Sequence, residues 1–226
     1  MAAAPHPDPG LREVIPQLRF AVQGADGLAY AAVPTLSFEL QVDAPGGHPI
    51  RSVLLDVQIQ IAARARGYEA AAQQRLLELF GPVADWGTNL RTLPWLRTTA
   101  VVPAFTDSTV VALAVPCTYD LEVTAARYLA ALDDGVVPLE LLFSGTVFFT
   151  GADGTLQTAR IAWDNEVHYA LPVAVWRRTM DRHFPNTAWL RLGADSFARL
   201  CAYKARHAFT SWEQAIDSLL DGPQRT

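Results

Sequence analysis

Three segments in the first third of the chain alternate apolar and polar side chains with a period of two residues. The longest covers residues 53–61, where the apolar positions are Val53, Leu55, Val57, Ile59 and Ile61. Shorter examples cover residues 18–22 and 36–42. Successive side chains of a strand point to opposite faces of its sheet, so this pattern buries one face and exposes the other. It is typical of antiparallel sheets covered on one side and argues against a parallel α/β sheet.

The rest of the chain adds strands first and helices last. Strand patterns and a hairpin turn at Gly151–Gly154 predict further strands over residues 99–105, 109–115, 139–150, 156–161 and 166–171. Helix formers and their flanking Gly, Pro and capping residues predict helices over residues 68–80, 172–184, 195–207 and 210–220. The last of these is expected to open with a capping box at Thr210–Glu213. Residues 121–132 fit a strand that runs into a helix.

The predicted fold class is therefore α+β. We expect an antiparallel β-sandwich or a strongly curled sheet of about seven to nine strands, with an inserted helix and a C-terminal three-helix segment. Residues 1–13 are expected to form a disordered lead, and residues 14–221 a single domain. Within that domain, residues 14–171 are mainly β and residues 172–221 are helical.

Charge and hydropathy exclude several classes of partner. Only 18% of the 226 residues are charged, and the net charge is −5 without a basic block, so nucleic acid is not an expected partner. The apolar runs are too short to cross a bilayer, and the first residues lack the pattern of a signal peptide. Cys117 and Cys201 are expected to be reduced thiols. We expect a cytoplasmic protein without a transmembrane segment.

The sequence holds none of the common catalytic or nucleotide-binding motifs, and its five histidines have no metal-ligand spacing. The weak candidates for an enzyme of unfamiliar type are Cys117, Asp120 and His168, with Tyr119 beside them. Asp120 with Glu122, and the segment 163–166, offer carboxylates but fit a solvated strand face and a turn. We therefore expect no metal and no cofactor, and an enzyme is the less favoured alternative.

Tryptophans and one phenylalanine mark the expected protein-binding surface. The sequence places them mostly outside the strands, in an expected aromatic loop over residues 86–95 and in the C-terminal helices. Aromatic side chains of this kind are enriched where partners dock. The alternative is that they seal the helices onto the sheets. The expected partner-binding residues are Trp86, Trp95, Phe184 and Trp189.

Several segments resemble an uncharacterised actinobacterial family of about this length. They are residues 102–105, 116–120, 142–148, 171–176, 184–190 and 212–215. Genes of that family tend to lie near those of uptake NiFe-hydrogenases, so the resemblance implies an accessory role in hydrogenase assembly or maturation. The leading hypothesis is a non-catalytic interaction module whose partner is a hydrogenase subunit or maturation protein. The enzyme and a chaperone-like homo-oligomer remain the alternatives.

Overall fold

The computed structural model describes residues 15–118, 120, 123–162, 164–187 and 191–222. The chain forms two compact units, Met1–Ala188 and Trp189–Thr226, and each is described by itself. The expectation of one domain over residues 14–221 stays a prediction. None of the helices in the described part of the chain is long and apolar enough to cross a membrane.

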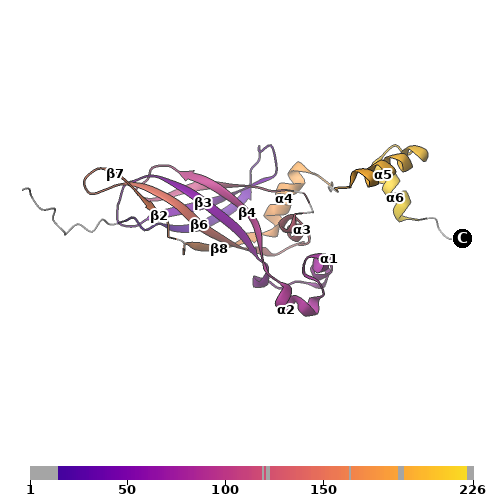
Figure 1. Cartoon of the computed structure of the whole chain (residues 1–226), viewed down its shortest axis with the longest axis horizontal. Helices are drawn as coiled ribbons and strands as arrows, with labels where there is room; N and C mark the ends of the chain where they lie inside the picture. The colour runs from indigo at the N-terminus through magenta and orange to yellow at the C-terminus, as the bar shows by residue number, and fades with distance from the viewer. Residues whose placement is uncertain (1–14, 119, 121–122, 163, 188–190, 223–226) are drawn as a thin grey trace, which may run out of the picture. The chain divides into compact units, whose positions relative to one another are not determined.

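The described part of the first unit forms two antiparallel sheets, as the alternating segments predict (Figure 1). The first sheet has the strand order β1-β2-β5, formed by Arg19–Gly27, Thr35–Ala44 and Asp107–Pro116. The second has the order β4-β3-β6-β7, formed by Thr92–Val102, Ile50–Ala62, Val136–Thr150 and Leu156–Arg160. A further strand, β8 (Glu166–Pro172), pairs with the N-terminal half of β6. The predicted α+β class is confirmed.

The core lies between the apolar faces of the two sheets. The five alternating apolar side chains Val53, Leu55, Val57, Ile59 and Ile61 of β3 are fully buried, and so are the alternating apolar positions of β2. Phe20 of β1 stacks on Phe143 of β6 with 4.3 Å between ring centroids, which joins the two sheets. The period-two pattern thus does bury one face of each strand.

Among the described residues of the first unit, four helices gather at one end of the sheets, and the turn between β6 and β7 lies at the other end (Figure 1). They are α1 (Ala70–Phe80), α2 (Trp86–Asn89), α3 (Thr124–Ala130) and α4 (Val173–His183). Short 3-10 turns, η1 (Ala63–Ala65) and η2 (Val83–Asp85), precede α1 and α2. The helices at residues 68–80 and 172–184 are confirmed to within two residues at each end.

The expected aromatic loop over residues 86–95 is wrong. Its first part forms α2, and its last part belongs to β4, an edge strand that begins at Thr92. Pro94 lacks a ladder N–H and is tolerated there because β4 is an edge strand. A register shift opposite Ile59 and Gln60 also breaks the alternation that would have revealed the strand.

The strands expected over residues 99–105 and 109–115 correspond to β4 and β5, which span Thr92–Val102 and Asp107–Pro116. The strands β4 and β5 lie in different sheets, where β4 pairs with β3 and β5 pairs with β2. Asp107 has a positive φ of 66° and is the first residue of β5. The segment between them crosses from one sheet to the other.

The second unit contains α5 (Ala194–Arg206) and α6 (Trp212–Leu220). The capping interaction of α6 lies one residue later than expected, because the N-cap is Ser211, whose hydroxyl accepts from the Gln214 N–H at 3.1 Å. The Gln214 side chain accepts in turn from the Thr210 N–H at 2.9 Å. The N-cap of α5 is Gly193, and Asp195 lies in its first turn.

Candidate functional site

The residues proposed for catalysis lie in different parts of the first unit. Cys117 follows β5 and is buried, and burial raises the pKa of its thiol to about 12. Such a thiol stays protonated at neutral pH and is a poor nucleophile. Asp120 is half-buried, whereas His168 is exposed on β8 of the second sheet. Tyr119 lies outside the described residues.

The residues proposed for partner binding are less exposed than expected. Trp86 is buried, and its indole N–H donates to the Gly81 carbonyl at 2.9 Å. It also packs edge-on against Tyr68 and Phe80, so it belongs to an interior aromatic cluster. Trp95 and Phe184 are half-buried against the core, and Trp189 lies outside the described residues. Trp86 therefore lies in the core of the first unit, and partner binding by these four residues stays a prediction.

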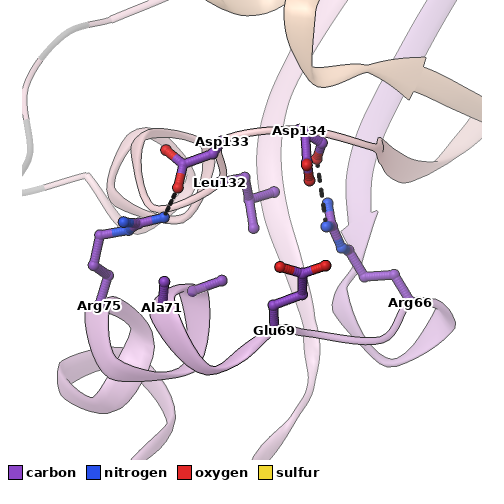
Figure 2. Close-up of a pocket in the computed structure, with 8 residues that line it drawn as sticks. Arg66, Glu69, Ala71, Arg75, Leu132, Asp133 and Asp134 are labelled. Carbon is purple, nitrogen blue, oxygen red and sulfur yellow. Dashed lines mark hydrogen bonds and ion pairs between the residues drawn. The ribbon is translucent and has the colours of Figure 1, made fainter.

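A small cavity lies between the start of α1 and the loop after α3 (Figure 2). Its volume is about 130 Å³, well below the roughly 300 Å³ of a usual ligand pocket. The two arginines that line it contact backbone carbonyls and the Asp133 carboxylate. Arg66 donates to the Val136 carbonyl at 2.8 Å, and Arg75 pairs with Asp133 and donates to the Ala131 carbonyl. These arginines fasten the α3–β6 loop to α1, which is a structural role.

Asp133 forms the ion pairs that connect this loop to two helices. It pairs with Arg75 of α1 and, at 2.6 Å, with Arg177 of α4. The hydrogen bond from Arg75, followed by the charges of Arg75 and Arg177, holds the pKa of Asp133 below its ordinary value. One carboxylate in the loop after α3 thus pairs with arginines of α1 and α4.

The two helices of the second unit share an exposed apolar surface, which we call the C-terminal apolar face. Phe197 of α5 contacts Trp212 of α6 with 5.6 Å between ring centroids. Residues at positions i, i+4, i+7 and i+8 of a helix share one side, which places the apolar residues of α6 together. The exposed members of the face are Phe197, Trp212, Ile216, Leu219 and Leu220.

A second polar cluster lies on the exposed side of the second sheet. Glu140 of β6 meets Glu166 and His168 of β8, and one ligand atom of each lies within 4.8 Å of the others. The imidazole Nε2 of His168 is 3.4 Å from a carboxylate oxygen of Glu166. This cluster joins residues that are far apart in the sequence.

Comparison with known proteins places the chain in a family. A family model described as a family of unknown function, DUF6084, matches residues 15–226. The chain belongs to DUF6084. No curated protein matches this DUF6084 chain.

Two solved structures show a remote likeness to this DUF6084 chain. A Bordetella pertussis protein named ApaA has a TM-score of 0.27 and 12% identity, over 70% of this chain and 95% of its own. A beta-glucosidase 3B from Thermotoga neapolitana, solved with α-D-glucose, has a TM-score of 0.24 and 11% identity, over 69% of this chain and 17% of its own. At these scores neither likeness bears on the function of this chain.

The sequence of this DUF6084 chain did not predict its two surface features, the C-terminal apolar face and the cluster of Glu140, Glu166 and His168. The C-terminal apolar face could have been found from the helical spacing of Trp212, Ile216 and Leu220. The cluster of Glu140, Glu166 and His168 has no complete local signal, because strand pairing alone brings Glu140 to the other two. Of the candidate residues, His168 and Glu166 of the segment 163–166 belong to this cluster.

Proposed function

We propose that this protein is a non-catalytic interaction module that binds another protein through its C-terminal apolar face. The observation that carries the proposal is the exposure of large apolar side chains on both helices of the second unit. Leu220 is 78% exposed, Leu219 is 52% exposed and Phe197 is 48% exposed. Side chains of this size are favourable at the centre of protein interfaces, where their burial removes apolar area from water.

The small size of the second unit supports the same proposal. Chains below about 40 residues usually need a disulfide, a metal or a partner to stay folded. In the described part of this unit, Ala215 is the only fully buried hydrophobic residue, and Cys201 is a free thiol. A partner that covers Trp212, Ile216 and Leu220 would supply the missing burial.

The chemistry of the face indicates the kind of partner. Aromatic side chains such as Phe197 and Trp212 act as anchors in apolar pockets. Lys204 lies over the Trp212 ring at 5.3 Å and provides a polar border. The matching surface is an apolar groove on a folded protein. Together with the resemblance to a family encoded near uptake NiFe-hydrogenases, this supports a hydrogenase subunit or maturation protein of the cytoplasm as the partner.

The experiment is co-purification of the full chain from native cells, with the bound proteins identified by mass spectrometry. The test variant Ile216→Asp/Leu220→Asp places two charges on the face. A matched variant, Ala198→Asp/Ala205→Asp, places two charges on exposed positions of α5 outside the face. We expect the parent and the matched variant to retain a hydrogenase component and the test variant to lose it.

Other outcomes contradict separate parts of the proposal. Equal recovery with the test variant contradicts the face as the binding surface. Recovery of no hydrogenase component contradicts that partner. A parent that light scattering shows to be a dimer, with the test variant monomeric, indicates instead that a second copy covers the face and that the protein is a homo-oligomer.

A further inference from the structure

We propose that the exposed side of β6 and β8 binds a divalent transition-metal ion, with Zn²⁺ as the best fit, through Glu140, Glu166 and His168. This metal site lies on the second sheet and does not depend on the proposed interaction function. It is carried by strand register, by the spacing of the ligand atoms and by the charge around them.

Strand register brings the three side chains together. His168 lies directly opposite Glu140, and Glu166 lies opposite Leu142 in the antiparallel pairing of β8 with β6. The Phe143 N–H donates to the Asn165 carbonyl, and the Val173 N–H donates to the Gly135 carbonyl. Hydrogen-bonded pairs alternate with non-hydrogen-bonded pairs, so Glu140 and His168 form a non-hydrogen-bonded pair, in which side chains come closest.

The faces of the two strands also agree with this placement. Leu139, Leu141 and Phe143 of β6 are buried, which leaves Glu140 on the opposite, solvent-facing side. Glu166 and His168 are two residues apart in β8, so they share one face. Their side chains are 43% and 74% exposed, which gives an ion free access from solvent.

The spacing of two ligand atoms already matches a tetrahedral zinc site. Zn²⁺ binds nitrogen and oxygen at about 2.0–2.2 Å, so neighbouring ligand atoms in a tetrahedron stand roughly 3.3–3.5 Å apart. His168 Nε2 and the Glu166 carboxylate oxygen are separated by 3.4 Å. A Glu140 carboxylate oxygen lies within 4.8 Å of both and offers the third ligand atom.

The charge around the cluster favours a cation. In the described ranges of the chain, no Arg or Lys pairs with Glu140 or Glu166, although other carboxylates of the protein pair with arginines. Neighbouring like charges on adjacent strands are destabilising. On the other side of β6, Glu140 faces Gln60 of β3, a neutral side chain. A bound divalent ion would neutralise the two carboxylates.

The donor set selects the class of ion. One imidazole and two carboxylates suit Zn²⁺ and related transition metals, whereas Mg²⁺ and Ca²⁺ prefer sets made only of oxygen. Three protein ligands leave the fourth tetrahedral position to water, because the cluster faces solvent. The sequence predicted no metal site because no two of these ligands have the local spacing of a zinc motif.

The test is titration of the untagged full chain with ZnCl₂ by calorimetry at pH 7.5, with MgCl₂ and CaCl₂ as comparison ions. We expect one Zn²⁺ per chain and much weaker binding of the other two ions. The variants Glu140→Gln, Glu166→Gln and His168→Gln should each weaken Zn²⁺ binding by about tenfold or more. His48→Gln, which removes a histidine from the turn between β2 and β3, is the matched control and should bind as the parent does.

Thermal unfolding provides a second readout. An ion that binds only the folded chain raises its melting temperature, so Zn²⁺ should stabilise the parent and His48→Gln but not the three site variants. Circular dichroism of the metal-free variants checks that they fold. Zn²⁺ binding weaker than about 100 μM in the parent, or binding that all three site variants retain, would overturn the proposal.

Discussion

The phenol oxygens of Tyr68 and Tyr128 lie 2.8 Å apart, and their hydrogen bond links the segment before α1 to α3. Tyr68 also donates its proton to the Ala63 carbonyl at 2.6 Å. A phenol has one proton, so Tyr128 must be the donor in the bond between the two rings. The Tyr68 hydroxyl therefore takes part in two hydrogen bonds, and the Tyr128 hydroxyl donates one.

We expect Tyr68→Phe to destabilise the protein more than Tyr128→Phe does. Loss of the Tyr68 hydroxyl leaves the fully buried Tyr128 O–H without its acceptor and the Ala63 carbonyl without its donor, at a cost of about 2 kcal/mol. Loss of the Tyr128 hydroxyl removes only one donor to the half-buried Tyr68, at about 1 kcal/mol. Urea unfolding of the two variants measures the difference, and the reverse order would contradict the donor assignment.

Alkaline pH should weaken the fold through Cys117. Burial raises the pKa of this thiol from 9.0 to about 12 in the folded chain. As the pH rises, the thiol therefore loses its proton first in the unfolded chain. The stabilisation that the protonated thiol gives the folded chain is complete below pH 9 and is lost as the pH rises toward 12. Between pH 8 and 10, ionisation of Cys117 in the unfolded chain should lower the free energy of unfolding by about 1 kcal/mol.

The variant Cys117→Ala isolates this contribution, because it removes the titrating group. Denaturant unfolding under reducing conditions at pH 8, 9 and 10 should show a smaller loss of stability for the variant than for the parent. Burial also raises the pKa values of Tyr68 and Tyr128, whose ordinary value is 10.0, so their losses add at still higher pH. Equal pH dependence of the variant and the parent between pH 8 and 10 would contradict the role of Cys117.

A methyl group at Gly145 should be poorly tolerated. Gly145 has a φ of 141°, and an added Cβ would lie 2.0 Å from the Leu54 carbonyl oxygen of the neighbouring strand. We expect Gly145→Ala to cost about 3 kcal/mol or more, because the strands β3 and β6 must separate locally.

Gly154→Ala is the matched control for this substitution. Gly154 also has a positive φ, of 81°, but it lies in the turn before β7, and its Cβ would meet no atom within 4 Å. Its cost should stay near the backbone penalty of about 1 kcal/mol. Thermal unfolding compares the two, and similar losses of stability would show that the contact with Leu54 is unimportant.

Removal of the Asp133 charge should loosen the junction of α1, α3 and α4. Asp133→Asn should lower the melting temperature at pH 7, because the ion pairs with Arg75 and Arg177 are lost. The paired carboxylate has a lowered pKa, so its contribution is present above its ordinary value of 3.8 and is lost as the pH falls through the lower folded value. The difference between variant and parent should therefore shrink in acid.

The neighbouring Asp134 offers the control. Arg66 donates to the backbone carbonyl of Asp134, so Asp134→Asn keeps this contact (Figure 2). We expect its melting temperature at pH 7 to match the parent's. A drop as large as that of Asp133→Asn would mean that general charge, not the specific pairs, stabilises the junction.

Local patterns predicted the strands that bury one complete face. The alternation over residues 36–42 and 53–61 located β2 and β3, and the turn formers at Gly151–Gly154 located the β6–β7 hairpin. These features depend on a few neighbouring residues, and so one sequence is enough to find them.

Features that depend on distant residues were not predictable in this way. The burial of the Trp86 side chain depends on contacts with Tyr68 and Phe80. The residue at which β4 begins depends on the position of this strand at the edge of its sheet. Tryptophan has the same local signature in an interior cluster and in a binding loop. Its exposure is set by which helices pack over it.

The sequence by itself determined the α+β class and the buried face of the central strands, because side-chain alternation and turn chemistry act within a few residues. Only the tertiary structure decided that β4 and β5 belong to different sheets and that Glu140 meets Glu166 and His168. Strand register, which joins segments about 25 residues apart, is fixed by the pairing of whole strands around a shared core. Chemistry assembled across strands therefore appears only when the fold is complete.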